Sequence, residues 1–431
     1  MPRWPRQRHG NPASHAPPHR RTGHRPLMAA RQLPPLQPSA RNLALVRRRV
    51  RLWRPPFVAA MSRWVQLSVA GRERVPKRRP ALFLANHTGF FDPPIMVRAA
   101  GDPVTMLATA SNFREGPLGR FFVHFGAVPK MKYTADARAI INLKRWADAG
   151  AYVGLFPEGE RTWDGRPLPL APGIEKLVRL LDVPVVTMRI YNGFRQSPRW
   201  SPRFRRGAVH VEMDEPRHFI RATPLSEIRR YVEERIAVDA LSAPRYPVAG
   251  SGFARGIANV AWACPQCLLI DGLHEAGNTL ACHGCRGTWR VDADARLNGR
   301  RGTATYTLPE AVDRVRLHYD GAAADDRLLP PASEPMSLLD ITSGHPREVA
   351  AGALRLTADE LLVDGLDGFD GFDAAAPWRL PIDRVQSITV DMRRRLTFHV
   401  GRRYLEAVIP RESVLKWEWF VKRLQAGRAQ R

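Results

Sequence analysis

The sequence predicts a multidomain protein. It should contain an α/β domain preceded by amphipathic helices, a small unit built around four cysteines, and a C-terminal antiparallel β domain capped by one helix. Three observations predict this order. Strand-like and helix-like segments alternate over residues 71–240, as in α/β domains. Two C-x-x-C pairs follow, and short alternating apolar runs then recur from 345 to 425. At 431 residues the chain also exceeds the size of one compact core.

The first part of the chain is strongly basic. The formal net charge is +26, and residues 1–72 contain fifteen Arg but no Lys, Asp or Glu. Residues 1–40 mix Arg, His and Pro without apolar periodicity, so they are predicted to be disordered. This charge favours an anionic partner, either a membrane surface or nucleic acid.

Residues 41–70 are predicted to form amphipathic helices at a membrane surface. The apolar positions of the first helix recur at helical spacing between arginines: Leu43, Val46, Val50 and Trp53. Pro55-Pro56 is expected to end this helix, because proline removes backbone donors. A second apolar face follows at Phe57, Met61 and Trp64. Docking onto an anionic leaflet is favoured over packing on the next domain, since a buried face does not require so many arginines.

Two short apolar runs of the α/β domain each lead into a loop with reactive side chains. Ala81–Ala85 precedes the first loop, Asn86–Asp92, and Tyr152–Leu155 precedes the second loop, Phe156–Arg161. Such runs are typical of strands buried on both faces. Ligands of open α/β sheets bind at the carboxyl ends of strands, so the loops are candidate site residues.

Further elements of this domain follow from spacing and punctuation. Ile140, Leu143 and Trp146 predict a helix that ends at Gly150. Residues Gly173 to Leu181 read as another helix, and Val183–Ile190 as another strand.

The two loops together suggest acyl transfer onto a phosphorylated alcohol. An alcohol attacks efficiently at neutral pH only when a base removes its proton, and His87 is the natural base. Asp92 can fix the tautomer of that histidine and stabilise its protonated form. In the second loop, a carboxylate, a glycine and the Arg161 guanidinium suit a phosphate.

Four ordered blocks resemble the glycerolipid acyltransferase family typified by 1-acyl-sn-glycerol-3-phosphate acyltransferase (lysophosphatidic acid acyltransferase). The first loop matches its N-H-x4-D block and the second its F-P-E-G-x-R block. Gly126–Lys132 resembles the segment that ends in a basic acceptor-binding residue, and Val183–Val186 resembles the apolar-proline strand. The likeness covers residues 60–220.

The resemblance implies that His87 is the base and Asp92 its orienting carboxylate. It places four residues at the acceptor phosphate: Glu158, Gly159, Arg161 and Lys132. The family moves a fatty acyl group from a thioester of coenzyme A or acyl carrier protein to the hydroxyl of a lysophospholipid such as 1-acyl-sn-glycerol 3-phosphate, and that step needs no metal. Two positions depart from the family: Glu160 replaces a small hydroxyl residue, and Lys132 replaces arginine.

The four cysteines form two pairs separated by fourteen residues, Cys264/Cys267 and Cys282/Cys285. This spacing can place four thiolates tetrahedrally around Zn²⁺, so residues 263–292 are predicted to be a zinc ribbon with a closed, structural site. With no thiol left for a disulfide framework, a reducing, cytoplasmic compartment is favoured. Residues 241–262 resemble a linker, and 293–344 are assigned as a connecting segment.

The C-terminal unit, 345–425, shows alternating runs followed by one helix. The expected strands are Ala353–Asp359, Glu360–Leu366, Val385–Val390, Leu396–Val400 and Tyr404–Ile409. The helix shares one apolar face: Val414, Trp417, Phe420, Val421 and Leu424. This order resembles the pleckstrin-homology or GRAM superfold, which does not by itself define a ligand. Lipid-headgroup binding, protein binding and a structural role all stay open.

No apolar run approaches the roughly 20 residues that cross a bilayer. The leading interpretation is therefore a peripheral acyltransferase at the inner, cytoplasmic face of the membrane. The alternatives are acylation of another lipid acceptor, a nucleic-acid- or protein-binding zinc-ribbon protein, and a lapsed lipid-binding scaffold. Nucleic-acid binding leaves His87 and Arg161 without a role, and the chain lacks the interleaved aromatics of a single-strand groove.

Overall fold

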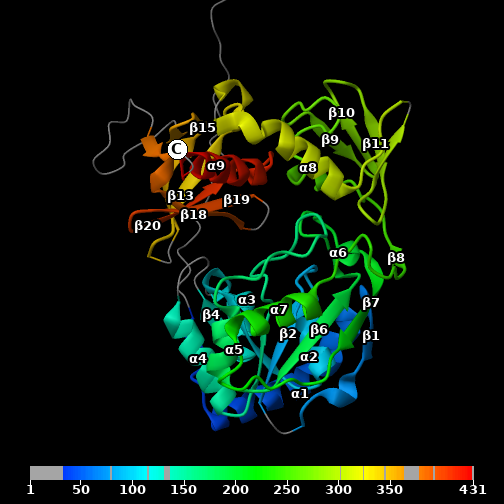
Figure 1. The fold of residues 1–431 in the computed structure, drawn as a ribbon, viewed down its shortest axis with the longest axis vertical. Helices are drawn as coiled ribbons and strands as arrows, with labels where there is room; N and C mark the ends of the chain where they lie inside the picture. The colour runs from blue at the N-terminus through cyan, green and yellow to red at the C-terminus, as the bar shows by residue number, and fades with distance from the viewer. Residues whose placement is uncertain are drawn as a thin grey trace, which may run out of the picture.

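The computed structural model describes residues 33–77, 80–113, 116–130, 136–300, 302–323, 325–343, 346–363, 378–391 and 394–429. The chain forms an α/β lobe, blue to green in Figure 1, and a second lobe, drawn mainly in yellow to red. Lys132 and residues 1–32 of the predicted N-terminal segment lie outside the described residues.

A mixed eight-stranded sheet organises the α/β lobe. Its order is β1-β7-β6-β2-β5-β3-β4, with β8 paired to β7. The central strands are parallel, whereas β7 runs antiparallel to β6 and parallel to β1. The strands are β1 (Val65–Ala70), β2 (Ala81–Ala85), β3 (Val104–Thr109), β4 (Val128–Lys130), β5 (Tyr152–Leu155), β6 (Val185–Tyr191), β7 (Arg206–Met213) and β8 (Val248–Ala249).

Helices cover both faces of this sheet, which explains the unbroken apolar runs. Leu82 and Leu84 of β2 belong to the core shared with α4 (Ala137–Asp148), α5 (Ile174–Leu181) and α7 (Leu225–Ile236). The alternate residue Phe83 belongs to the core shared with α2 (Asp92–Ala100). The lobe also contains α3 (Pro117–His124) and α6 (Gly193–Gln196). Gly150, φ +88°, follows α4 as expected.

The N-terminal helix corrects the prediction of a break at Pro55-Pro56. One helix, α1 (Ala40–Met61), runs through both prolines. The carbonyls of Arg51 and Leu52 lose their helical N–H partners, but this stretch is exposed and water can hydrate them. The assignment of 41–70 to helices also ends too late, because Val65–Ala70 forms β1.

The apolar face of α1 is divided between protein and solvent. Leu43 and Val46 are 3% and 1% exposed, whereas Trp53 is 59% exposed. Arg47 also holds the helix on the lobe, since its Nε lies 2.9 Å from Asp102 Oδ2. The first half of the helix therefore packs on the domain, which was the less favoured interpretation.

The second half of the predicted linker, residues 241–262, is part of a folded core. Ala254, Ile257 and Ala261 are fully buried, and Trp262 is 2% exposed. They join the large core of the second lobe. The small residues that suggested a flexible segment instead allow close packing.

The predicted connecting segment, 293–344, is also structured. It contains β12 (Leu297–Arg300), α8 (Leu308–Tyr319) and β13 (Met336–Asp340). A reciprocal capping box between Thr307 and Glu310 begins α8. Around the cysteines, an antiparallel sheet has the order β12-β11-β10-β9, with β9 (Leu273–Ala276), β10 (Thr279–Cys282) and β11 (Thr288–Val291).

The C-terminal part forms two antiparallel sheets and a closing helix, α9 (Val414–Ala429). The sheet orders are β14-β13-β20-β19-β18 and β15-β16-β17. Their remaining strands are β14 (Arg347–Gly352), β15 (Leu354–Leu356), β16 (Glu360–Val363), β17 (Trp378–Pro381), β18 (Val385–Asp391), β19 (Arg395–Val400) and β20 (Arg403–Val408). The five predicted strands overlap β15, β16, β18, β19 and β20. The unit begins at Met336 rather than 345, because β13 pairs with both β14 and β20.

Candidate active site

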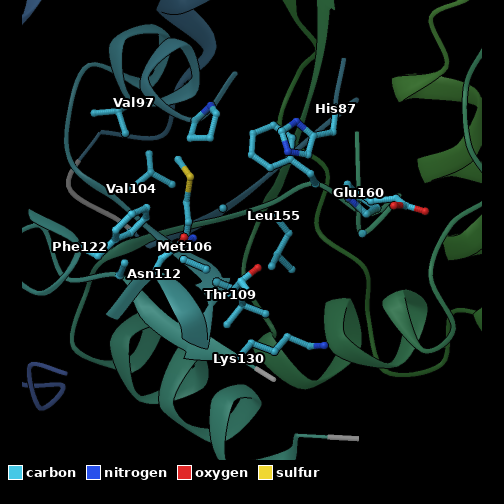
Figure 2. Close-up of a pocket in the computed structure, with 18 of the residues that line it drawn as sticks. His87, Val97, Val104, Met106, Thr109, Asn112, Phe122, Lys130, Leu155 and Glu160 are labelled. Carbon is cyan, nitrogen blue, oxygen red and sulfur yellow. The ribbon is translucent and has the colours of Figure 1, made fainter. Parts of the chain in front are cut away.

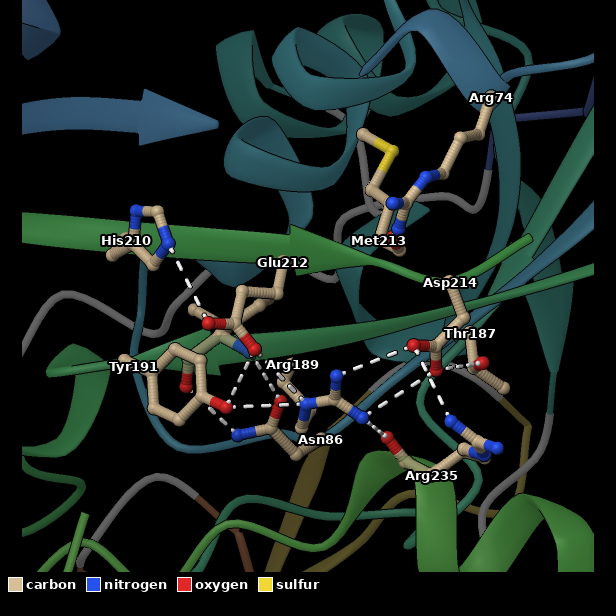
Figure 3. A network of polar contacts seen from close by, with 11 residues as sticks. Arg74, Asn86, Thr187, Arg189, Tyr191, His210, Glu212, Met213, Asp214 and Arg235 are labelled. Atoms are coloured by element: carbon tan, nitrogen blue, oxygen red, sulfur yellow. Dashed lines mark hydrogen bonds and ion pairs between the residues drawn. The ribbon is translucent and has the colours of Figure 1, made fainter. Parts of the chain in front are cut away.

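Asn86 anchors the first loop where β2 ends. Its Oδ1 accepts the N–H of Ile190 at 2.7 Å, and its Nδ2 donates to the carbonyl of the same residue at 3.0 Å. Figure 3 shows the adjoining polar network on β6 and β7, in which Arg189 lies 3.3 Å from Glu212 and 3.2 Å from Asp214. The first loop therefore begins where hydrogen bonds of Asn86 connect the end of β2 to β6.

His87 and Asp92 form the pair that the spacing predicted. His87 Nδ1 lies 2.9 Å from Asp92 Oδ2, which also accepts the N–H groups of Thr88 at 2.6 Å and Gly89 at 2.7 Å. Asp92 is fully buried at the first turn of α2, where the helix dipole favours a carboxylate. Because a carboxylate only accepts, Nδ1 carries the proton and Nε2 of the neutral ring is the free base.

Two glycines allow the first loop to pack against α6. A Cβ on Gly193 would lie 2.6 Å from Thr88 Oγ1, and one on Gly89 would lie 2.8 Å from the Gly193 carbonyl oxygen. Both separations are too short for a real side chain. Ser197 Oγ then accepts the N–H of Phe90 at 2.8 Å, which fixes the loop from the α6 side.

The second loop contacts the first through Glu158 and Phe156. Glu158 Oε2 accepts the N–H of His87 at 2.8 Å, and its Oε1 accepts that of Leu168 at 3.3 Å. The Phe156 ring stacks on the His87 ring, with centroids 4.1 Å apart. Glu158, expected at the acceptor phosphate, instead binds backbone N–H groups from a position 8% exposed. Gly159 turns the loop at φ +78°, a backbone region that favours glycine.

Burial shifts the pKa of both ionisable groups that join the loops. It lowers the pKa of His87 below its usual value; Asp92 opposes this, while Arg161 and Arg199 add to it. Burial also raises the pKa of Glu158 to about 7, against the opposing bonds from His87 and Leu168 N–H. The histidine is therefore held neutral at neutral pH, as a general base requires.

The charged end of the second loop includes a partner that sequence reasoning missed. Arg161 is partly buried, and Glu160 Oε2 lies 2.5 Å from Arg199 Nη1. Lys130 of β4 lines the pocket beside the loops, as Figure 2 shows. Lys130 lies in the block Gly126–Lys132, which the sequence had already related to acceptor binding. No local signal marks Arg199.

The site opens into a large, mainly apolar pocket of about 1960 Å³. Figure 2 shows His87, Met106, Phe122 and Leu155 among its lining residues. Side chains of α1 and α3 extend it, and Ser387 and Lys422 contribute from the second lobe. A pocket of this size and lining can hold a long apolar chain beside a polar reaction centre.

The four cysteines converge at one place in the second lobe. All four Sγ atoms lie within 4.8 Å of one another, with Cys264–Cys285 at 3.8 Å and Cys267–Cys282 at 3.6 Å. Four thiolates placed tetrahedrally at 2.3 Å from Zn²⁺ would be about 3.8 Å apart. The donor set and its spacing therefore fit zinc.

Comparisons with known proteins point to the same region. Residues 66–191, which include both loops, match the model of the family described as Acyltransferase. The 1-acyl-sn-glycerol-3-phosphate acyltransferase of Borreliella burgdorferi is 24% identical over 130 residues, covering 30% of this chain and 52% of the relative. The chain thus spans about half the length of that curated relative.

A solved structure also shows similarity. The 1-acyl-sn-glycerophosphate (LPA) acyltransferase PlsC from Thermotoga maritima is 21% identical, covering 46% of this chain and 75% of that one at a TM-score of 0.36. Among the helices of the described residues, none is long and apolar enough to cross a membrane.

Proposed function

We propose that this chain transfers a fatty acyl group from an acyl thioester of coenzyme A or acyl carrier protein to the hydroxyl of a lysophospholipid. 1-Acyl-sn-glycerol 3-phosphate is the first acceptor to test. The observation that carries the proposal is the contact between His87 and the buried Asp92, joined to the second loop at the wall of an apolar pocket. The Acyltransferase match over both loops supports the same reaction class.

The proposed reaction proceeds in two steps. His87 Nε2 takes the proton of the acceptor hydroxyl while its oxygen attacks the thioester carbonyl. The tetrahedral intermediate expels the thiolate, which takes the proton back from His87. Asp92 holds the ring through Nδ1–H and stabilises the imidazolium formed between the two steps. No acyl-enzyme intermediate is required.

The acceptor phosphate is assigned to the basic side of the second loop. Arg161 offers two parallel donors, and Lys130 adds a point charge on the pocket wall. Lys132, which lies outside the described residues, stays a predicted member of this group. Glu158 is reassigned to holding the loops together, because its two oxygens accept backbone N–H groups.

The decisive experiment is turnover by purified His87→Ala with acyl-CoA and lysophosphatidic acid in detergent. We expect a loss of at least about 10⁴-fold in kcat/KM, because the variant lacks the base. Far-UV circular dichroism should match the wild type, since the loop contributes little to the core. Wild-type turnover in a correctly folded His87→Ala protein would end the proposed mechanism.

We also propose that the pocket mouth contacts an anionic membrane surface. Trp53 and Phe57 of α1 and Leu118 and Phe121 of α3 are 40–59% exposed and line the same pocket. Apolar side chains beside arginines suit the interface of a leaflet. A Trp53→Ser/Phe57→Ser protein should sediment less with anionic vesicles than a Leu317→Ser control. Equal sedimentation would contradict this surface.

The cysteine cluster is proposed to hold one structural zinc ion. The four sulfur atoms fill every position of a tetrahedral site, so no position stays open for catalysis. Metal analysis of the purified chain should find one equivalent, lost in Cys264→Ser. Zinc-free protein with an unchanged protease digestion pattern would remove this assignment.

A further inference from the structure

The segment after α6 contacts both loops of the site and the second lobe. Ser197 Oγ accepts the N–H of Phe90 from the first loop at 2.8 Å. Two residues later, Arg199 contacts the second loop and β18. Figure 1 places α6 at the edge of the α/β lobe that faces the second lobe. Residues 197–199 therefore lie where the first loop, the second loop and the second lobe meet.

Arg199 makes four contacts from a position that is only 8% exposed. Its Nη1 lies 2.5 Å from Glu160 Oε2 and donates to the carbonyl of Arg161 at 2.9 Å. Its Nη2 donates to the carbonyl of Val390 in β18 at 3.0 Å. The guanidinium also lies 4.0 Å from the centre of the Trp163 ring. Burying a cation costs folding free energy unless its donors are paired. The donors of Arg199 find partners in the α/β lobe and in the second lobe.

These contacts offset the unusual charge of Glu160. A carboxylate beside Arg161 would compete for that guanidinium and repel an acceptor phosphate. Arg199 holds the carboxylate at 2.5 Å and bonds two backbone carbonyls at the same time. A planar guanidinium can span these partners, whereas the single ammonium of lysine presents a point charge.

We propose that Arg199 is a positioning residue for the acyl transfer proposed above. It fixes the second loop against the second lobe and keeps Glu160 from the acceptor phosphate. Since the carbonyl of Val390 supplies one anchor, the second lobe is part of the functional enzyme rather than an independent appendage. The inference rests on the proposed function, and Arg199 itself lies beyond residues 66–191 of the family match.

Arg199 also influences the His87 ring electrostatically. The ring faces Asp92, Arg161 and Arg199, and its backbone N–H faces Glu158. Burial is the main cause of its lowered pKa, and Arg199 contributes in the same direction. A neutral residue at 199 should therefore raise the pKa of His87 and move the acid limb of activity to higher pH. A role confined to stability would leave that limb in place.

The test compares Arg199→Gln and Arg199→Lys with Arg203→Gln, a nearby exposed arginine outside the site. Arg199→Gln should lower kcat by about 100-fold, the scale of a small misplacement of reacting groups. Its acid limb should also move upward. Arg199→Lys keeps the charge, so it should show an intermediate kcat with a nearly unchanged acid limb. Turnover and acid limb equal to those of Arg203→Gln would overturn the proposal.

Hydrogen–deuterium exchange gives a readout that needs no substrate. In full-length Arg199→Gln, exchange should increase at residues 156–163 and at 385–391 together, relative to Arg203→Gln. Unchanged exchange at both segments would overturn the positioning role. If Arg199→Gln fails to fold, the kinetic and exchange measurements are made on Arg199→Lys instead. If the wild-type chain transfers no acyl group, the proposed function fails, while the exchange result still decides whether Arg199 joins the loop to the second lobe.

Discussion

The first and second loops lie side by side, but they are held in different ways. The first loop is fixed mainly within itself and by the adjacent strand, because Asp92 binds three neighbours and Asn86 pairs with Ile190. The second loop is fixed by distant parts of the chain. Glu158 binds the first loop, and Arg199 connects the second loop to β18.

The first loop is therefore a local motif, whereas the second loop is part of a site that distant segments assemble. The proposed base and its orienting carboxylate are five residues apart, so their geometry depends on one short turn. The proposed phosphate-binding side requires that several segments meet. Substitutions in the first loop should therefore change the chemical step, whereas those in the second should change acceptor binding or depend on the second lobe.

The largest effect that would sharpen this comparison is expected for Asp92→Asn. The side chain keeps its shape, but the neutral amide oxygen at the Oδ2 position no longer supplies the negative charge that stabilises protonated His87, so kcat should fall about 10⁴-fold. Among the described residues, Asp92 Oδ1 has no hydrogen-bond partner, so this position can receive the new NH₂ group without breaking a bond. Steady-state kinetics on folded protein provides the measurement. A kcat within tenfold of the wild type would show that the pair is structural.

Arg161→Ala should have an intermediate effect, seen at neutral pH mainly in the affinity for the acceptor. Loss of a charged hydrogen-bonding partner is worth about 2 kcal/mol, so the acceptor KM should rise roughly 30-fold. The effect should appear in the acceptor KM, because binding common to the ground and transition states is expressed in KM. The KM for the thioester should stay unchanged. Arg161→Lys is the matched control and should lie between the two. An unchanged acceptor KM in Arg161→Ala would remove the phosphate from the assignment.

The prediction for Glu158 concerns the pH dependence of stability rather than turnover. Its pKa is raised from 4.5 to about 7, so the folded state holds a proton that the unfolded chain has released between these values. Stability from this group is therefore present at low pH and is lost as pH rises through 7, by about 3 kcal/mol in total. Thermal unfolding from pH 5 to 8.5 should show a smaller decline for Glu158→Gln than for the wild type. Parallel curves would contradict a buried, proton-holding Glu158.

The pKa of His87 is shifted in the opposite direction, and this shift affects activity. Its pKa lies below the usual 6.5, so activity should persist to below that pH and fall only as the ring becomes protonated.

Local patterns in the sequence determined many of the elements and the contact between His87 and Asp92. Unbroken apolar runs predicted strands buried on both faces, and β2 and β5 are such strands. The five-residue spacing predicted the contact between His87 and Asp92, because a single turn before α2 suffices to form it. The paired cysteines likewise predicted a four-sulfur cluster, since each pair needs only one tight turn.

Tertiary packing decided what no local pattern records. The helix α1 continues through Pro55-Pro56 because its exposed carbonyls can be hydrated there. The alanine-rich segment before Cys264 is core rather than linker because a second lobe surrounds it. Glu158 binds the backbone of the first loop because folding brings the N–H of His87 to its carboxylate. Arg199 reaches Glu160 across 39 positions and Val390 across 191, and contacts at such separations arise only from the packing of the whole chain.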